Sequence, residues 1–574
     1  MKLLLRYLKP YYLRMLGGFC IKVTGTLAEL VLPYILSHIL KNVVVFQGVD
    51  QIILWGGLMI FFAAVAWILN ITANRMASKV AKLFSLRLRR DLFARTIRLS
   101  AAQTDRFTVA SLESRITTDT YNIHNFVNMS QRLGVRAPIL LIGGIAITMV
   151  MDQYLSLVMA AVLPLIFAIV YLISRNGVPL YGKVQKAVDA MIRVVREDIQ
   201  GIRVIKALSK DAYEHRRYDK VNQALVKEEK HAGTVMGSVN PVMTLLMNMG
   251  ITAVVALSAS RVANHQSDPE TVIAFMQYFT QISMAMMTVT RMFVMYSKCS
   301  ASAGRVQEVL DAPDELAERD SAEFPSGDKS FAIEFDHVSF SYEGKKHDLE
   351  DISFTLRPGQ HLGVIGATGS GKSTLIRLLL RFYDVKSGSV RLDGQDVRTI
   401  DRGELYRRFG TAMQNDFLYA DTIAENIRFG RDISREALEA AAKTAQAYGF
   451  ITDFADGFEH MLAQKAANIS GGQKQRLLIA RALAAKPEIL ILDDSSSALD
   501  YKTEAGLRKA LAEDLTGTTV VTVAQRVSAV KSCDLILVLD EGRIIGSGKH
   551  AQLLESCPAY REISDSQMGG AIID

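Results

Sequence analysis

One stretch decides how the second half of the chain folds: Gly366-Ala367-Thr368-Gly369-Ser370-Gly371-Lys372-Ser373-Thr374. It follows an apolar segment, residues 361–365, which predicts a strand, and it opens a helical segment that continues to Leu380. This is the phosphate-binding pattern G-x-x-x-x-G-K-[ST] between a strand and a helix. The glycines let successive backbone N–H groups turn towards a polyphosphate, and the helix N-terminus adds a favourable dipole. We expect Lys372 to reach the β- and γ-phosphates and the Ser373 hydroxyl to be a ligand of Mg²⁺.

The composition predicts a membrane protein. The chain has 574 residues, enough for about three domains, and 49% of them are hydrophobic. Apolar runs crowd the first 300 positions, whereas charged and turn residues dominate afterwards. The formal net charge of +7 is compatible with nucleic acid or with a membrane surface. Because the basic residues lie in loops between apolar runs, we favour the membrane and expect no nucleic-acid partner.

Six apolar segments are each long enough to cross a hydrocarbon layer of ~30 Å, which takes about 20 helical residues. They lie near residues 15–40, 52–74, 133–151, 154–174, 236–260 and 271–297. No short apolar core with a small-residue cleavage site precedes them, so we expect no signal peptide to be removed.

The distribution of Lys and Arg predicts the orientation of these spans. Basic residues flank the first segment and fill the long connections 75–132 and 175–235. By contrast, the turns near Gly48, Asp152 and Asp268 carry almost none. The positive-inside rule therefore places both ends of the chain in the cytoplasm.

Each of the two long connections is predicted to form one helix followed by another. Two helices of about 25 residues would extend roughly 37 Å beyond the membrane. The turning points are predicted near residues 106–119 and 201–211. Such stalks are longer than the topology needs, so we expect them to contact something in the cytoplasm; a solvated charged stalk is the alternative.

Polar residues inside the spans are costly, and they usually face a cavity or a partner. Lys22 and Glu29 are seven residues apart, hence on one face of the first span, where they could pair. Arg291 lies in the sixth span among several methionines, which suit a surface that accepts varied apolar shapes. Packing between helices is the alternative interpretation of the methionines.

The chain changes character after Ser300. A polar, acidic segment with Pro313, Pro325 and Gly327 predicts a linker over 301–328, between a membrane domain at 1–300 and a second domain at 329–574. Alternating residues at 333–340 predict a strand, and Asp393-Gly394 predicts a hairpin turn. Strands then alternate with helical runs, as in an α/β domain with a largely parallel sheet.

Two further motifs accompany the phosphate-binding stretch. The apolar strand at 489–492 ends in Asp493-Asp494, and an aspartate there fits the second Mg²⁺-organising position of a P-loop nucleotidase. Residues 469–476, Ile-Ser-Gly-Gly-Gln-Lys-Gln-Arg, begin a helix and form a second anion-binding helix N-terminus. Since the P-loop already holds a nucleotide from its own side, the second N-terminus makes sense if it faces the nucleotide of another subunit.

With these motifs the chain resembles a half-transporter of the ATP-binding cassette (ABC) family, of the exporter type, along its whole length. The resemblance implies an all-α six-helix transmembrane domain followed by an α/β P-loop nucleotide-binding domain, with ATP and Mg²⁺ as cofactors. It also resembles exporters at Arg106-Phe107 and Ser114–Asp119 and at Gly201–Ala207, which would hold coupling helices at the stalk tips.

The resemblance also implies the roles of individual residues. Tyr342 would stack on adenine (an ordinary strand aromatic is the alternative), Gln414 would be the Q-loop glutamine, and Ser497–Asp500 would be the D-loop. The nucleotide-binding set is Tyr342, Gly366, Ala367, Thr368, Gly369, Ser370, Gly371, Lys372, Ser373, Thr374, Gln414, Ser470, Gly471, Gly472, Gln473 and Asp500. The expected Mg²⁺ ligands are Ser373, Gln414 and Asp493, and the expected catalytic positions are Asp494 and Gln525.

The sequence departs from the family at the catalytic positions. Exporters carry a glutamate where this chain has Asp494, and a histidine where it has Gln525. Aspartate is one methylene shorter, and a shift of about 1 Å can cost on the order of a hundredfold in rate. Glutamine binds phosphate without supplying charge or a proton. Gln464, where exporters usually have glutamate, is a milder departure.

These departures lead to the hypothesis that the chain is the degenerate-site subunit of a heterodimeric exporter. Its intact signature motif, Ile469–Gln473, would complete the partner's site. Drugs, lipids, peptides and lipophilic metabolites are all possible amphipathic cargo. A homodimer with two slow sites, an exporter-fold importer of a metal-siderophore and an ATP-gated regulatory subunit are the alternatives. One membrane unit joined to one cassette suits a bacterial inner membrane.

Overall fold

The computed structural model describes residues 2–44, 48–263, 269–324, 326–342, 344, 347–414, 416–495 and 498–568. The chain forms two compact units. The helical unit comprises Met1–Arg98 and Thr108–Ala312, and the α/β unit comprises Leu99–Phe107 and Pro313–Asp574.

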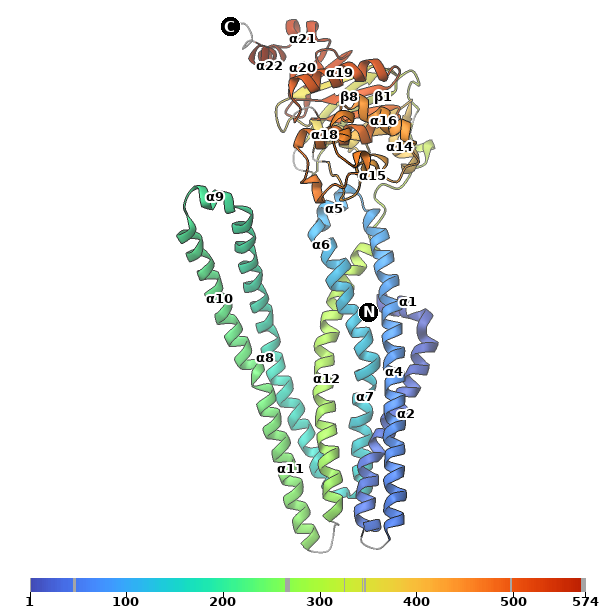
Figure 1. Cartoon of the computed structure of the whole chain (residues 1–574), viewed down its shortest axis with the longest axis vertical. Helices are drawn as coiled ribbons and strands as arrows, with labels where there is room; N and C mark the ends of the chain where they lie inside the picture. The colour runs from blue at the N-terminus through green and yellow to red at the C-terminus, as the bar shows by residue number, and fades with distance from the viewer. Residues whose placement is uncertain are drawn as a thin grey trace. The chain divides into compact units, whose positions relative to one another are not determined.

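The helical unit is built almost entirely from long helices (Figure 1). Its elements are α1 (Lys2–Leu8), η1 (Lys9–Tyr11), α2 (Tyr12–His38), η2 (Ile39–Val43), α4 (Val49–Ile97), α6 (Val109–Ser114), η3 (Arg115–Asp119), α7 (Thr120–Met151), α8 (Gln153–Gln200), α9 (Ile202–Ala207), α10 (Asp211–Gly237), α11 (Val239–Ala263) and α12 (Pro269–Leu310).

Six helical segments of the described chain are long and apolar enough to cross a membrane, which confirms the six predicted spans. They are Lys2–Val43, Val49–Ile97, Val109–Met151, Gln153–Gln200, Asp211–Ala263 and Glu270–Leu310. The helix α4 alone has 49 residues. At 1.5 Å per residue it is roughly 74 Å long, more than twice the ~30 Å of hydrocarbon. The second span therefore continues into the first stalk without a break in α4.

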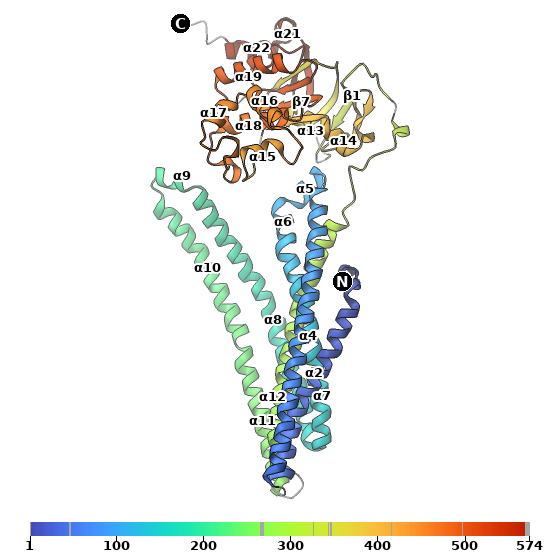
Figure 2. The same ribbon diagram turned by 45° about the vertical axis from the view of Figure 1, so that its right-hand side comes forward.

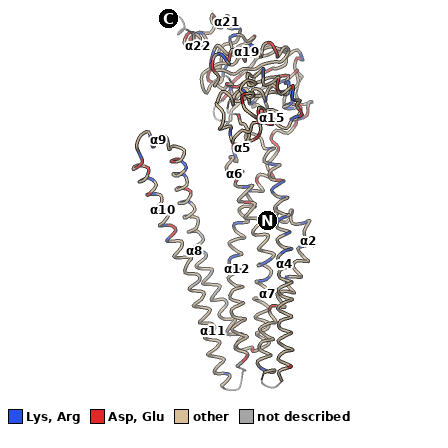
Figure 3. The backbone as a smooth tube through the Cα atoms, in the orientation of Figure 1, with Lys and Arg blue, Asp and Glu red and all other residues tan. Residues whose placement is uncertain are grey.

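The stalk helices α8 and α10 pack side by side and are joined by α9, as both views show (Figures 1 and 2). This turn agrees with the turning point predicted at 201–211. Lys, Arg, Asp and Glu are frequent along α10 and sparse along α11 (Figure 3). At the C-terminal end of its sequence, the unit continues in α12 to Leu310, ten residues beyond the domain boundary predicted at residue 300.

The first stalk turn lies earlier than the predicted 106–119. The helix α4 ends at Ile97 and α5 (Ala101–Phe107) begins four residues later, so the chain turns over residues 98–108. Ser100 starts α5 with a reciprocal pair of bonds: its hydroxyl accepts from the Gln103 N–H at 3.0 Å, and the Gln103 side chain accepts from the Ser100 N–H at 3.1 Å. This is a capping box, and its S-x-x-Q pattern was a local signal of the helix start.

The core of the helical unit lies among α2, α7 and α12. The Tyr278 hydroxyl of α12 donates to the Leu30 carbonyl of α2 at 2.6 Å. Gly144 of α7 allows close packing, because a Cβ there would lie 2.8 Å from Ile282. Methionines of α12 pack against Met243 of α11, in agreement with the helix-packing interpretation of the methionine-rich segment.

The expectation that Lys22 pairs with Glu29 is wrong. The Lys22 ammonium donates to Asn70 at 2.7 Å and to Asn74 at 3.2 Å, whereas Glu29 pairs with Arg136. Seven helical residues correspond to roughly 10 Å of rise, so each side chain bonds to nearer groups on neighbouring helices.

The α/β unit contains two sheets. Its strands are β1 (Ile333–Phe340), β2 (Leu349–Leu356), β3 (His361–Gly366), β4 (Ser387–Leu392), β5 (Gln395–Asp396), β6 (Phe409–Ala412), β7 (Ile489–Asp493), β8 (Thr519–Val523), β9 (Leu535–Asp540) and β10 (Arg543–Gly548). The first sheet is antiparallel in the order β2-β1-β4-β5, and the second has the order β10-β9-β3-β8-β7-β6. All neighbours in the second sheet except β10 and β9 are parallel, which confirms the predicted largely parallel sheet.

Helices surround the second sheet (Figure 2). The helical elements of this unit are α5, η4 (Ser321–Glu323), α13 (Lys372–Leu379), η5 (Val397–Thr399), α14 (Arg402–Arg407), α15 (Ile423–Arg428), α16 (Arg435–Thr444), α17 (Tyr448–Thr452), η6 (Gly457–Glu459), η7 (Gln464–Ala466), α18 (Gly471–Leu483), α19 (Tyr501–Asp514), α20 (Val527–Val530), α21 (His550–Ser556) and α22 (Pro558–Met568). All five residues of β7 are buried, so this strand lies inside the core. The hairpin predicted at Asp393-Gly394 joins β4 to β5.

Candidate nucleotide site

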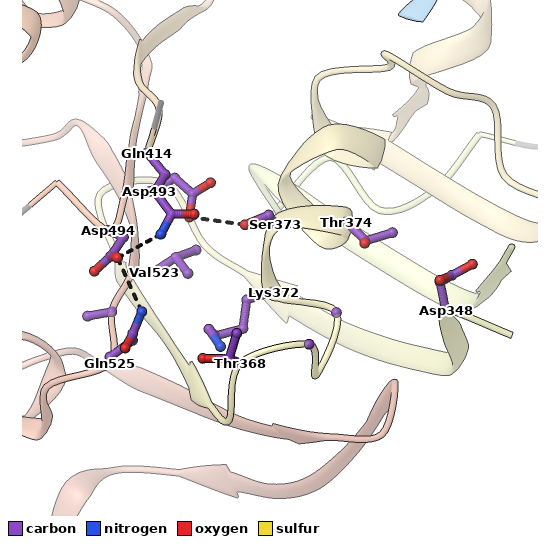
Figure 4. Close-up of a pocket in the computed structure, with 13 residues that line it drawn as sticks. Asp348, Thr368, Lys372, Ser373, Thr374, Gln414, Asp493, Asp494, Val523 and Gln525 are labelled. Atoms are coloured by element: carbon purple, nitrogen blue, oxygen red, sulfur yellow. Dashed lines mark hydrogen bonds between the residues drawn. The ribbon is translucent and has the colours of Figure 1, made fainter. Parts of the chain in front are cut away.

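The candidate site lies at the carboxyl edge of the six-stranded sheet. Neighbouring parallel strands all end at this edge, so the residues that follow β3, β8, β7 and β6 meet there. They enclose a cavity of about 320 Å³ (Figure 4). Its lining residues are Asp348, Thr368, Gly369, Gly371, Lys372, Ser373, Thr374, Gln414, Asp493, Asp494, Val523, Ala524 and Gln525.

The loop after β3 has the shape of a phosphate cradle. Gly369 and Gly371 have φ of +87° and +100°, a backbone region that favours glycine. A Cβ on Gly371 would also lie 2.9 Å from the Asp348 carbonyl oxygen. Within the part of the chain that the structure describes, the buried Ser370 hydroxyl has no hydrogen-bond partner. An anion in the cradle would offer such a group an acceptor, so the loop fits a polyphosphate.

Lys372 begins α13 and lies against its own loop. Its ammonium donates to the carbonyls of Gly366 at 2.8 Å and Ala367 at 2.7 Å. Burial lowers the pKa of Lys372, and the nearby carboxylates of Asp494 and Asp493 partly offset that effect. The lysine is thus held at the mouth of the phosphate cradle.

Ser373 and Asp493 place a hydroxyl and a carboxylate close together beside the phosphate cradle. The Ser373 hydroxyl lies 3.5 Å from a carboxylate oxygen of Asp493, which stands at the end of β7 and is 3% exposed. Burial raises the pKa of Asp493, whereas the Ser373 hydrogen bond lowers it. A hydroxyl and a carboxylate beside a phosphate cradle are oxygen ligands of the kind that Mg²⁺ prefers, so these residues fit the ion.

Asp494 is held between two side-chain amides (Figure 4). The Gln414 amide donates to its Oδ2 at 2.9 Å, and the Gln525 amide donates to the same oxygen at 3.2 Å. The backbone of Asp494 is also fixed, because its N–H donates to the Val523 carbonyl at 2.9 Å and its φ is +49°. The sequence identified all three residues singly, but it gave no signal for this three-residue clamp.

Tyr342 lies on the α13 side of the loop and does not line the cavity. Its hydroxyl contacts the Thr374 hydroxyl at 3.3 Å and accepts from Arg377 at 3.0 Å. Its ring stands edge-on to Tyr383, and its N–H donates to the Asp348 carboxylate at 2.9 Å. No sequence motif indicated Asp348 or Arg377; Asp348 is only six residues from Tyr342, whereas the fold brings Arg377 to it.

The signature residues lie apart from the cavity. Ser470 caps α18, where its hydroxyl and the Gln473 side chain form a reciprocal capping box. Ser470 and Gly471 are exposed, and a Cβ on Gly472 would lie 3.1 Å from the Ala498 carbonyl. The signature thus packs on the D-loop, in which Asp500 caps α19. Ser497 lies outside the described residues, and Gln464 is exposed in η7.

Comparison with known proteins places both units in one family. Residues 15–286 match the model of the ABC transporter transmembrane region, and residues 349–497 match the ABC transporter model. An uncharacterised ABC transporter ATP-binding protein of Mycobacterium tuberculosis is 32% identical over 100% of this chain and 99% of its own length. One of Bacillus subtilis is 32% identical over 98% of each chain.

A solved structure has the same fold. The structure of a bacterial Atm1-family ABC exporter with ATP bound superposes with a TM-score of 0.82 at 23% identity, covering 98% of each chain. The exporter fold, the phosphate cradle at the sheet edge and the relatives along the whole length agree with one another. The chain therefore belongs to the ABC transporter family.

Proposed function

We propose that this chain is the degenerate-site subunit of a heterodimeric ABC exporter. The observation that carries the proposal is the clamp on Asp494. Its Oδ2 already accepts hydrogen bonds from the amides of Gln414 and Gln525, both of them neutral groups. The site therefore has a shorter carboxylate, one oxygen of which already accepts two hydrogen bonds, where the family has a glutamate, and an amide where it has a histidine.

Bound ATP and Mg²⁺ would supply an activated phosphoanhydride, and the residues of this chain would hold and orient it. The loop N–H groups and Lys372 would bind the phosphates, and Ser373, Asp493 and Gln414 would hold the metal. A catalytic carboxylate must lie within hydrogen-bond reach of the proton it takes. Asp494 is one methylene shorter than glutamate and is turned towards two amides, so it is poorly placed for that work.

The intact signature supports a role in the partner's site. Ser470 and Gly471 are exposed at the N-terminus of the 13-residue helix α18. Backbone N–H groups at such a terminus attract anions. In the proposed heterodimer they would bind the γ-phosphate of the nucleotide held by a second half-transporter, which would carry the regular glutamate and histidine.

The cargo and the membrane belong to the proposal as well. Six spans joined to one nucleotide-binding domain suit export of an amphipathic small molecule, lipid or peptide. Relatives of full length occur in Mycobacterium tuberculosis and Bacillus subtilis, which favours a bacterial cytoplasmic membrane with the α/β unit inside.

The test is the ATPase activity of the chain purified alone and co-expressed with any half-transporter that a neighbouring open reading frame encodes. The partner carries Glu→Gln at its catalytic position in one preparation, and this chain carries Asp494→Asn in another. We expect activity only in the pair, a loss of about a hundredfold or more with the partner variant, and little change with Asp494→Asn.

The opposite pattern would overturn the proposal. An active preparation of the chain alone that Asp494→Asn abolishes would mean a self-sufficient homodimer. Exposed Asp453, which lies outside the cavity, provides the matched control as Asp453→Asn.

A further inference from the structure

Six polar side chains form a layer between three helices of the helical unit. This polar layer consists of Lys22 and Glu29 on α2, Asn70 and Asn74 on α4, and Arg132 and Arg136 on α7. None of these residues belongs to the nucleotide site. All of them lie in or beside segments that are apolar enough to cross a membrane.

Hydrogen bonds and an ion pair hold the side chains of the polar layer in place. Lys22 is 4% exposed, and its ammonium donates to Asn70 and Asn74 at 2.7 and 3.2 Å. Asn70 is fixed in turn, because its own amide donates to the Ala66 carbonyl at 2.9 Å. Arg136 forms an ion pair with Glu29 across the α2–α7 contact.

The layer carries an excess of positive charge. Arg132, Arg136 and Glu29 are all close enough to Lys22 to interact with it electrostatically. Three cations face one carboxylate, which leaves two positive charges. An unbalanced charge at membrane depth is costly, and such charges usually mark a ligand or ion site. The two asparagines accept hydrogen bonds from Lys22 and do not neutralise it.

One face of α7 also holds polar atoms without partners. Asn128, Arg132 and Arg136 follow one another at intervals of four residues, hence on the same face of the helix. The buried Asn128 Oδ1, Arg132 Nε and Arg136 Nε have no hydrogen-bond partner among the described residues. The two guanidinium N–H groups would be satisfied by an acceptor such as a carboxylate or phosphate oxygen.

An apolar cavity of about 530 Å³ lies one helical turn from the layer. Its lining includes Leu16, Phe19, Ala73 and Val135, which come from the same three helices. Phe19 precedes Lys22 by three residues, so the cavity is on the N-terminal side of the layer along α2. With the N-terminus in the cytoplasm, this is the side of the inner leaflet. An apolar cavity beside a cationic layer matches the two parts of an amphiphile.

We propose that the polar layer binds the anionic group, phosphate or carboxylate, of an amphiphile that enters from the inner leaflet, with its apolar part against the adjacent cavity. Arginine suits this role because its planar guanidinium binds such groups through two hydrogen bonds. The inference deepens the proposed transport function by naming a chemical class of ligand. Its test needs no ATP turnover, so the failure of one proposal is distinguishable from the failure of the other.

The test is binding to the full-length chain, measured by native mass spectrometry. The probes are dioleoyl phosphatidic acid and dioleoylglycerol, which have the same acyl chains with and without the phosphate; inorganic phosphate is the third probe. We expect the chain to prefer phosphatidic acid, and Arg132→Gln and Arg136→Gln each to weaken its binding about tenfold. Arg75→Gln is the matched control, because Arg75 is exposed on the α4 turn next to Asn74. Arg132→Lys keeps the charge and should retain part of the affinity.

Each outcome decides the proposal. If inorganic phosphate competes as well as phosphatidic acid and the same arginine variants weaken it, the anion site stands but its ligand is a soluble anion. Equal binding of dioleoylglycerol and phosphatidic acid would overturn the proposal. The proposal would also be overturned if Arg75→Gln weakened phosphatidic acid binding as much as Arg132→Gln and Arg136→Gln do. ATP binding by the α/β unit and size-exclusion behaviour monitor folding, and the paired Gln and Lys variants at residue 132 separate loss of charge from loss of structure.

Discussion

Single residues decide what the nucleotide site can do. The cradle around Ser370, the lysine at its mouth and the Ser373–Asp493 pair are all present for binding. In the proposed function, hydrolysis would depend on the next residue, Asp494, whose Oδ2 accepts hydrogen bonds from two side-chain amides. We therefore expect ATP binding and ATP turnover to be separable at this site, because the proposal assigns them to different side chains.

The first prediction concerns Asp494 and Gln525, the two positions at which the chain departs from the family. In Asp494→Glu combined with Gln525→His, the longer carboxylate and the imidazole restore the groups that orient and accept protons. We expect ATPase activity of the chain alone, at concentrations where it dimerises, to rise tenfold to a hundredfold. Asp453→Glu is the control, since it makes the same change at an exposed position outside the cavity. No rise in the double variant would mean that these two positions do not limit turnover.

The second prediction concerns Tyr342. Stacking of a base on an aromatic ring is worth about 1–3 kcal/mol, so Tyr342→Ala should weaken binding of a fluorescent ATP analogue about tenfold. Tyr342→Phe removes the contacts with Thr374 and Arg377 and keeps the ring. It should bind nearly as well as the original chain. Equal losses in both variants would contradict stacking and would favour a structural role of the hydroxyl.

At the scale of elements, the short helix α5 packs in a unit whose other residues lie about 200 positions later in the sequence. It belongs to the α/β unit although it follows the long helix α4. Three hydrogen bonds of 2.7 Å attach it: Ser100 to Glu315, Gln103 to the Pro313 carbonyl, and Tyr383 to Asp105. Burial and the Asp105 hydrogen bond raise the pKa of Tyr383, so this phenol remains a donor throughout the neutral range.

The third prediction tests the start of α5. Loss of an N-cap serine costs about 1 kcal/mol, so Ser100→Ala should speed hydrogen exchange of the α5 amides about fivefold. Ser111→Ala in α6 is the control, because there the backbone N–H of Ser111, and not its hydroxyl, bonds to the capping Thr108. Unchanged exchange in α5 would mean that its other contacts hold the helix without the cap.

At the scale of the whole molecule, successive membrane spans run in opposite directions. The number of spans between two positions therefore determines whether they lie on the same side of the membrane. Gly48 precedes α4 and is exposed, and Lys210 precedes α10 and is exposed. An odd number of spans separates the two positions, so they must lie on opposite sides of the membrane. The positive-inside rule assigns Lys210 to the cytoplasm.

The fourth prediction is the labelling pattern of single cysteines. In a Cys20→Ser background, an impermeant maleimide should label Gly48→Cys in intact cells and Lys210→Cys only after permeabilisation. The remaining cysteines, Cys299, Cys533 and Cys557, are buried and should stay unlabelled. Labelling of Lys210→Cys in intact cells would reverse the topology.

Much of the fold and of the candidate site was predictable because its signals are local. The six spans, the strand before the cradle, the hairpin at Asp393-Gly394 and the strand ending at Asp493 all follow from patterns within about 20 residues. The position predicted for the first stalk turn is too late in the sequence, because that prediction did not take the capping box at Ser100 into account. The pairing of Lys22 with Glu29 was wrong because helical spacing says which residues share a face, but not which neighbour that face meets.

The sequence by itself thus determined the family, the two kinds of domain, and the chemical groups of the nucleotide site. These depend on residues that are adjacent along the chain, whose geometry local backbone preferences set. Only the tertiary structure decided that Gln414 and Gln525 converge on Asp494, that Asp348 and Arg377 hold Tyr342, and that α2, α4 and α7 share a cationic layer. Apart from the bond between Tyr342 and Asp348, which are six positions apart, these contacts join residues 31 to 107 positions apart, and packing brings them together.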